Sequence, residues 1–133
     1  MKNPGNSFLA LLALLLALVV AAPLAAQPLE VQQGAASYYG PKLHGRKTAS
    51  GERMDQETLI AAHPSWPFGT VARVTNLKNG RSTQVRIVDR GPARKARRRG
   101  VVIDLSTRAA RVLEFLKQGK TQVRVEVLRW GDR

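Results

Sequence analysis

The sequence predicts a mostly β domain with one short helix. Three observations lead to this class: several short segments alternate apolar and polar residues, an Asn-Gly pair separates two of them, and one later stretch has apolar residues at helical spacing. About five or six strands are expected, with the helix between the last two. Periodicity predicts the class but leaves the order of the strands open.

The first element, residues 1–26, has the layout of a secretory signal peptide. Lys2 supplies positive charge, residues 8–22 contain no polar side chain, and Pro23 and Leu24 are followed by the small residues Ala25 and Ala26. A bilayer span needs about 20 apolar residues, so we expect cleavage after Ala26, with an uncleaved anchor as the alternative. We therefore expect export to the periplasm or cell envelope.

The remaining residues suit a single domain of ordinary size. We expect a linker over 27–33, the domain over 34–129 and a tail over 130–133. The chain has no cysteine, so neither a lipid anchor, nor thiol catalysis, nor a thiolate metal site is expected. With only two histidines, His44 and His63, a zinc site is not expected either, and no cofactor is predicted.

The charge balance points to an anionic partner. The net charge is +13, and of these charges only Lys2 lies in the predicted signal. Because an exported protein does not meet nucleic acid, we expect anionic polymers of the cell envelope as partners and a monomeric protein. Five of the six residues in 94–99 are basic. This loop-like stretch is either part of that binding surface or a solvated basic face.

The strands are expected in chain order. Residues 34–40 show a strand-like alternation of side chains that ends at Gly40-Pro41. Residues 42–56 are expected to form a long loop of the kind that often carries function. Residues 59–62 are expected to form a short apolar strand. In residues 71–76 and 81–88 the side chains alternate with the period of a strand, and the Asn79-Gly80 pair between the two segments predicts a tight hairpin. Residues 101–105 and 121–128 are further strands, separated by a helix that starts after Ser106 as N-cap and runs toward Gly119.

Several segments together resemble one known family. They are GAASYYG, HGRKTASGE, LIAAH, VTNLKNGRS, VDRGP and IDLS, and they extend from Gly34 to about Val127. In this order and spacing the chain resembles the RlpA (rare lipoprotein A) family of peptidoglycan lytic transglycosylases. The resemblance implies a six-stranded double-psi β-barrel, shared with expansins. It also implies non-hydrolytic cleavage of the β-1,4 bond between MurNAc and GlcNAc in peptidoglycan glycan strands, leaving 1,6-anhydro-muramyl ends.

This chemistry needs few acidic residues. The leaving oxygen takes up a proton and the C6 hydroxyl loses one, and a single carboxyl group can transfer both. Asp89 is the first choice for this acid/base, because it ends a strand before Arg90-Gly91-Pro92 and matches the Asp of the family's DRGP segment. A turn-capping role is the alternative.

The resemblance implies two further catalytic positions. His63 matches the family's AAH segment, where it would orient the carboxylate or bind a sugar hydroxyl, although a lone histidine is often structural. Glu52 matches the TASGE segment in the long loop, where its alternative role is that of an exposed loop acid.

Other residues are assigned by chemistry. Tyr39 and Trp66 are candidates for stacking on sugar rings, although core packing is the alternative, and Arg90 is counted with them as substrate-binding. Asp104 is expected to be structural, as a helix cap or ion-pair partner. His44 has no assigned role.

Two competing functions stay open. A non-catalytic, expansin-like protein that binds glycan or loosens the wall would keep the aromatic and basic groove without turnover. A basic envelope-binding protein without a sugar site would explain the charge but not the matched segments. The sequence favours the enzyme because Glu52, His63 and Asp89 are all present.

Overall fold

The computed structural model describes residues 27–132, so the predicted signal peptide lies outside the described residues. Within this range the chain forms six strands, two α-helices and one 3-10 turn. In chain order they are β1 (Glu30–Tyr38), η2 (Pro41–Leu43), β2 (Ile60–Ala62), β3 (Val71–Asn76), β4 (Ser82–Asp89), α2 (Arg94–Arg98), β5 (Val101–Leu105), α3 (Thr107–Val112) and β6 (Thr121–Arg129).

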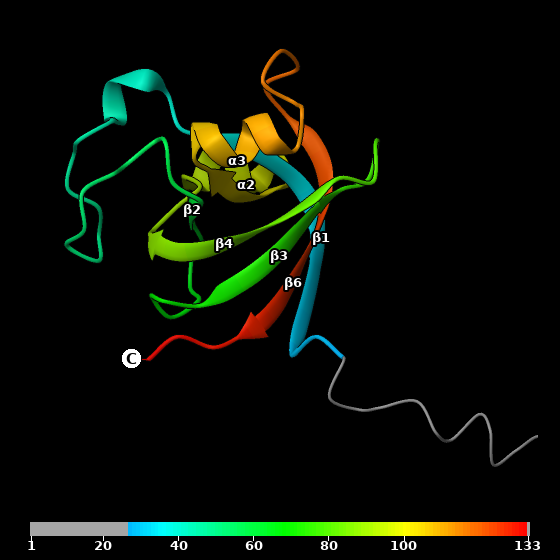
Figure 1. The fold of residues 1–133 in the computed structure, drawn as a ribbon, viewed down its shortest axis with the longest axis horizontal. Coiled ribbons are helices and arrows are strands. Elements are labelled where there is room, and N and C mark those ends of the chain that lie inside the picture. Colours follow the sequence, from blue (N-terminus) through cyan, green and yellow to red (C-terminus); the bar gives the residue numbers. More distant parts are fainter. Residues whose placement is uncertain (1–26, 133) are drawn as a thin grey trace, which may run out of the picture.

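The six strands close into a barrel with the order β1-β5-β2-β4-β3-β6 (Figure 1). The pairs β1/β5 and β2/β4 are parallel, and the other neighbouring pairs are antiparallel. Closure gives every strand two neighbours and leaves no open sheet edge. The helices α2 and α3 gather at one end of the barrel, and the long β1–β2 loop extends beside it. The predicted fold class, a six-stranded barrel, is confirmed.

The barrel interior is filled by alternate residues of the strands. Every second residue of β5 and β6 is buried, as the alternation predicted. Alanines occupy buried positions on β1, β2 and β3, where larger side chains would overfill a narrow barrel. Each fully buried valine or leucine contributes about 1.5–3 kcal/mol, so packing replaces the disulfides that a chain without cysteine cannot form.

The predicted hairpin is confirmed. Strands β3 and β4 pair antiparallel from Val71 with Arg86 to Thr75 with Ser82. Gly80 has a φ of 77° and donates its backbone N–H to the Asn76 carbonyl at 2.8 Å. A residue with a Cβ adopts this φ reluctantly, so glycine favours the tight turn here.

The helix α3 begins as predicted but ends early. The Ser106 side chain accepts the Ala109 N–H and caps the helix N-terminus. The expected run toward Gly119 is wrong, because the helix stops at Val112 and Glu114 has a φ of 60°. The Leu113 carbonyl accepts hydrogen bonds from the side-chain amides of Asn76 and Asn79. These tertiary partners replace the helical hydrogen bond and allow the chain to turn.

Strand β1 starts earlier than expected. Residues 30–33, assigned to the linker, are part of β1 and pair with β6 from Glu30 with Val127 onward. Glu30, Val31 and Gln33 are exposed, so this end of the strand lacks the apolar alternation that would have identified it. The linker shortens to residues 27–29.

The basic stretch and the tail are both more ordered than predicted. Arg94–Arg98 form the helix α2, which has no buried residue and therefore no apolar period in the sequence. Arg, Lys and Ala are good helix formers, and Gly100, with a φ of 90°, follows the helix. At the other end of the domain, Trp130 contacts Trp66 edge-on, and the Gly131 N–H donates to Thr70 Oγ1. No helix within residues 27–132 is long and apolar enough to cross a membrane.

Candidate active site

Asp89, the predicted acid/base, ends strand β4 and is held by three hydrogen-bond donors. Its Oδ1 accepts the backbone N–H groups of Ala49 and Arg90, each at 2.8 Å, and its Oδ2 accepts the Tyr39 hydroxyl at 2.8 Å. These three hydrogen bonds engage both carboxyl oxygens and hold the group in one orientation. The long β1–β2 loop therefore reaches back to the end of β4 and positions this side chain.

A β-bulge turns Asp89 toward this position. In the parallel pair of β2 and β4, Ala61 is opposite Ile87 but Ala62 is opposite Asp89, so Val88 is the extra residue. Val88 is fully buried and packs in a small second core with Met54, Ile60 and Tyr39. Bulges of this kind re-aim side chains beside functional sites.

Tyr39 contributes its hydroxyl to the site. The predicted role was stacking on a sugar, but its ring packs on the second core and its hydroxyl donates to Asp89. Burial raises the pKa of Tyr39, and the hydrogen bond to Asp89 and the charges of Asp89 and Asp104 raise it further. The phenol is therefore a fixed neutral donor at neutral pH.

Asp104 lies in the same site, which the sequence interpretation missed. This residue of β5 accepts the Ser37 hydroxyl from β1 and does not cap α3, because Ser106 does. Burial raises the pKa of Asp104, the charge of Asp89 raises it further, and the hydrogen bond from Ser37 opposes both. We call Ser37, Tyr39, Asp89 and Asp104 together the carboxylate site.

Strand register explains why the two aspartates come together. Ala62 of β2 is paired with Asp89 on one side and with Asp104 on the other. Paired residues point to the same face of a sheet, and strands lie about 4.8 Å apart, so the two aspartate Cα atoms are about 10 Å apart on one face. A Cβ on Gly91 would lie 3.5 Å from Ala62 Cβ and 3.2 Å from Asp104 Oδ2. Small residues thus leave room between the carboxyl groups.

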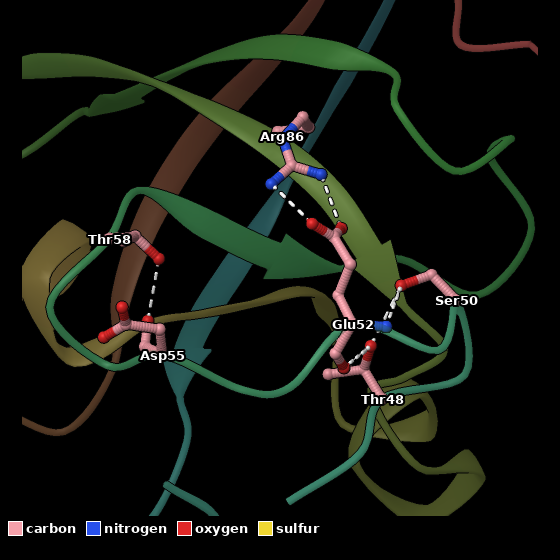
Figure 2. A network of polar contacts seen from close by, with 6 residues as sticks. All are labelled: Thr48, Ser50, Glu52, Asp55, Thr58 and Arg86. Atoms are coloured by element: carbon pink, nitrogen blue, oxygen red, sulfur yellow. Dashed lines mark hydrogen bonds and ion pairs between the residues drawn. The ribbon is translucent and has the colours of Figure 1, made fainter. Parts of the chain in front are cut away.

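Glu52 lies on the long loop but does not contact Asp89. Its carboxylate forms a bidentate pair with Arg86, at 2.6 and 3.1 Å (Figure 2). The Arg86 hydrogen bonds lower the pKa of Glu52. The loop around it is organised by Thr48, which donates both its N–H and its hydroxyl to the Glu52 carbonyl. A small open cavity of about 190 Å³ borders Glu52 and Arg86. A catalytic role for Glu52 stays a prediction.

His63 does not contact the Asp89 carboxylate, so the expected orienting contact is not made. Its Nδ1 accepts the backbone N–H groups of Ser65 and Trp66, and its Nε2 is 3.0 Å from Gln32 Oε1. Because Nδ1 is an acceptor, the proton resides on Nε2. Burial, and to a smaller extent the charge of Arg90, lowers the pKa of His63 to about 4. The side chain is a neutral residue that caps the turn after β2.

Trp66 is a core residue, so the predicted sugar-stacking role is wrong. It is 4% exposed, stacks on His63 at 3.8 Å, and donates its Nε1–H to Glu30. Neither ring face is available to a sugar, because His63 covers one and Trp66 belongs to the main core. Its burial could not be recognised from the sequence, since it lies in an irregular loop between β2 and β3.

Arg90 points away from Asp89 despite following it in the chain. Its Nη1 donates to the carbonyls of His63 and Trp66, and its guanidinium lies 4.0 Å from the centre of the Phe68 ring. The residue is still exposed, so substrate binding stays a prediction. We call His63, Trp66, Phe68 and Arg90 the aromatic cluster. Among residues 27–132, no group of His, Cys, Asp and Glu could hold a metal ion.

The fold and the site together define a class of protein: a closed six-stranded double-psi β-barrel that carries carboxyl groups where β2, β4 and β5 meet. A family model described as "Lytic transglycolase" matches residues 31–125. The chain belongs to this family, and the predicted resemblance to RlpA is confirmed.

The relatives agree with this assignment. The chain is 57% identical over 98 residues to the "Probable endolytic peptidoglycan transglycosylase RlpA" of Nostoc sp. (strain PCC 7120), covering 72% of this chain and 25% of that protein. It thus spans about a quarter of that relative. Among solved structures, the Streptomyces papain inhibitor is similar with a TM-score of 0.59 and 23% identity, covering 77% of this chain and 97% of that one. The apo expansin of Clavibacter michiganensis is similar with a TM-score of 0.58 and 22% identity, covering 78% and 53%. These structural likenesses concern the fold alone.

Proposed function

We propose that this protein cleaves the glycan strands of peptidoglycan as an endolytic transglycosylase. The observation that carries the proposal is the carboxylate of Asp89, held by Tyr39, Ala49 and Arg90 at the end of β4 in a chain of this family. The relative in Nostoc sp. is named for the same activity. Because the chain spans only a quarter of that relative, the activity requires a direct test.

The proposed reaction uses no water. The glycosidic oxygen between MurNAc and GlcNAc receives a proton from a carboxyl group, and the C6 hydroxyl of MurNAc attacks the oxocarbenium-like carbon. A hydrolase needs a second carboxylate to act as nucleophile or to activate water, whereas here the sugar supplies its own nucleophile. The product is a 1,6-anhydro-muramyl end.

The charge of the chain supports a proposal about its location and partners. The net charge of +13 favours contact with anionic envelope polymers and with the carboxylates of the cell wall. The N-terminal pattern supports export to the periplasm or cell envelope. We propose that the protein acts there as a monomer and does not bind nucleic acid.

The experiment that tests the function is a digestion assay. The purified protein is incubated with intact peptidoglycan and with peptide-free glycan strands, and the products are analysed by mass spectrometry. We expect anhydro-muramyl ends, each lighter by one water than a hydrolysis product. Asp89→Asn is expected to lower the rate by about 10²–10⁴-fold.

Asp132→Asn is the matched control, because Asp132 is exposed and lies outside the carboxylate site. Products that carry an added water would indicate hydrolysis. Binding of glycan without any product from the unmodified protein would favour the non-catalytic, expansin-like function and contradict the proposal.

A further inference from the structure

The two aspartates of the carboxylate site differ in the number of hydrogen bonds that they accept from the protein. Asp89 accepts three hydrogen bonds, two of them from backbone N–H groups. Asp104 accepts one hydrogen bond from a protein group, the Ser37 hydroxyl. Both aspartates pair with Ala62, so they share one face of the barrel wall. Hydrogen bonds from donors favour the charged form of a carboxyl group, so the aspartate with fewer donors keeps its proton more readily.

The other groups around Asp104 do not reverse this order. Strand β1 contributes Ser37, the residue after β1 contributes Tyr39, and strand β2 contributes Ala62, which has no charge. The chain after Asp89 contributes Gly91, next to Asp104 Oδ2. The Arg90 guanidinium is bound to the carbonyls of His63 and Trp66. The basic residues of α2, which precedes β5, are exposed.

We propose that Asp104 is the proton-holding carboxyl group of the active site and that Asp89 is its partner, which stabilises the charge that develops on the sugar. This inference rests on the proposed function and assigns the two acid/base steps within it. The raised pKa of Asp104, caused by burial and by the charge of Asp89, supports the same division. The role that the sequence assigned to Asp89 alone is thereby divided between two residues.

The steps balance without any other reactant. Asp104 gives its proton to the glycosidic oxygen as the bond from that oxygen to C1 of MurNAc breaks, and the bonding electron pair stays on the leaving oxygen. The positive charge that develops at C1 is stabilised by the Asp89 carboxylate. The C6 oxygen then bonds to C1, and its proton passes to the Asp104 carboxylate. The site returns to its starting state, and no water is consumed.

The first test measures protonation without catalysis. Carboxyl ¹³C NMR follows Asp104 through a pH titration, with Asp104→Asn used to assign its signal. We expect Asp104 to titrate above the ordinary Asp value of about 3.9. Asp89→Asn should lower the Asp104 pKa because it removes a like charge, and Ser37→Ala should raise it because it removes a donor to the charged form. Titration at or below the ordinary value, or indifference to Asp89→Asn, would overturn the proposal.

The second test measures the pH dependence of kcat/KM for glycan cleavage. Since the acid must be protonated, the rate falls as pH rises through the Asp104 pKa, and Ser37→Ala should move this fall to higher pH. A residue with a purely structural role would not shift the profile. Asp104→Asn should lower kcat by at least about 100-fold and remove the fall. Urea unfolding confirms that each variant is folded.

The outcomes separate the two proposals. If the unmodified protein forms no anhydro product, the proposed function fails, and the NMR titration still decides where the proton resides. If the unmodified protein cleaves glycan and Asp104→Asn cleaves it equally fast while Asp89→Asn does not, the function stands and the assignment to Asp104 is wrong. Asp132→Asn again serves as the matched control, with an unchanged profile expected.

Discussion

The carboxylate site and the aromatic cluster are formed by residues that are neighbours in the chain, yet they differ in kind. Asp89 belongs to the first and Arg90 to the second. In the same way, Ala62 separates the two aspartates, whereas His63, the next residue, stacks on Trp66. Successive residues at the end of a strand point to opposite faces of the sheet, so neighbours in the chain enter different environments.

The two clusters differ in how many of their polar groups have hydrogen-bond partners. In the aromatic cluster, both His63 nitrogens and the Trp66 N–H have partners, and the ring pair is buried. In the carboxylate site, Asp104 has one protein donor, the Ser37 hydroxyl, and burial together with the charge of Asp89 raises its pKa. Ionisable groups with raised pKa values are typical of functional sites, whereas polar groups that all have partners stabilise a fold.

The largest expected effect is a loss of stability when the aromatic cluster is truncated. Trp66→Ala should lower the free energy of unfolding by about 3–5 kcal/mol, because it leaves a cavity between His63 and Trp130. Urea unfolding measures this loss. Trp130→Ala is the matched control, since Trp130 is 40% exposed, and a much smaller loss is expected. Equal losses for the two variants would contradict the assignment of Trp66 to the core.

The next effect is a pH dependence of stability that His63 causes. In the folded protein its pKa is about 4, whereas in the unfolded chain it is about 6.5. Between these values the unfolded chain binds more protons, so the free energy of unfolding is highest above pH 6.5 and falls as pH drops toward 4.

We expect protonation of His63 to lower the free energy of unfolding by about 2 kcal/mol between pH 7 and pH 4.5. Urea unfolding at pH 7 and pH 4.5 measures it, and His63→Gln should flatten the slope between these values. A slope that is identical in the variant would show that His63 is not a buried neutral residue.

The smallest effect concerns Tyr39. Tyr39→Phe removes the hydroxyl that donates to Asp89 but keeps the ring. We expect about a tenfold lower kcat, little change in KM, and a loss of about 1 kcal/mol in stability, since Asp89 keeps two other donors. Steady-state kinetics on glycan strands measures the first two quantities. An unchanged kcat would mean that the hydroxyl has no part in the reaction.

Much of the fold could be predicted because its signals are local. The alternation of β3 and β4 around Gly80, the Ser106 cap and the valines of β6 each depend on residues close in the chain. The same holds for the position of Asp89 at a strand end. Helix α2 and the start of β1 were missed because neither has a regular apolar period.

The candidate site was less predictable, because its contacts join distant segments. Tyr39 and Asp89 are 50 residues apart, and Ser37 and Asp104 are 67 apart. Asp104 was expected to be structural, since nothing in the local sequence reveals the partner strand on either side of it. Trp66 was expected to bind sugar, since an aromatic residue in a loop gives no sign of its burial.

The sequence by itself determined the mostly β class, the hairpin, the helix cap and, through its matched segments, the family. Only the tertiary structure decided that two aspartates lie on either side of Ala62, that the Tyr39 hydroxyl donates to Asp89, and that the His63 side chain binds Gln32 instead of the Asp89 carboxylate. The physical reason is barrel closure. It sets the register between strands far apart in the chain, and the register decides which side chains share a face.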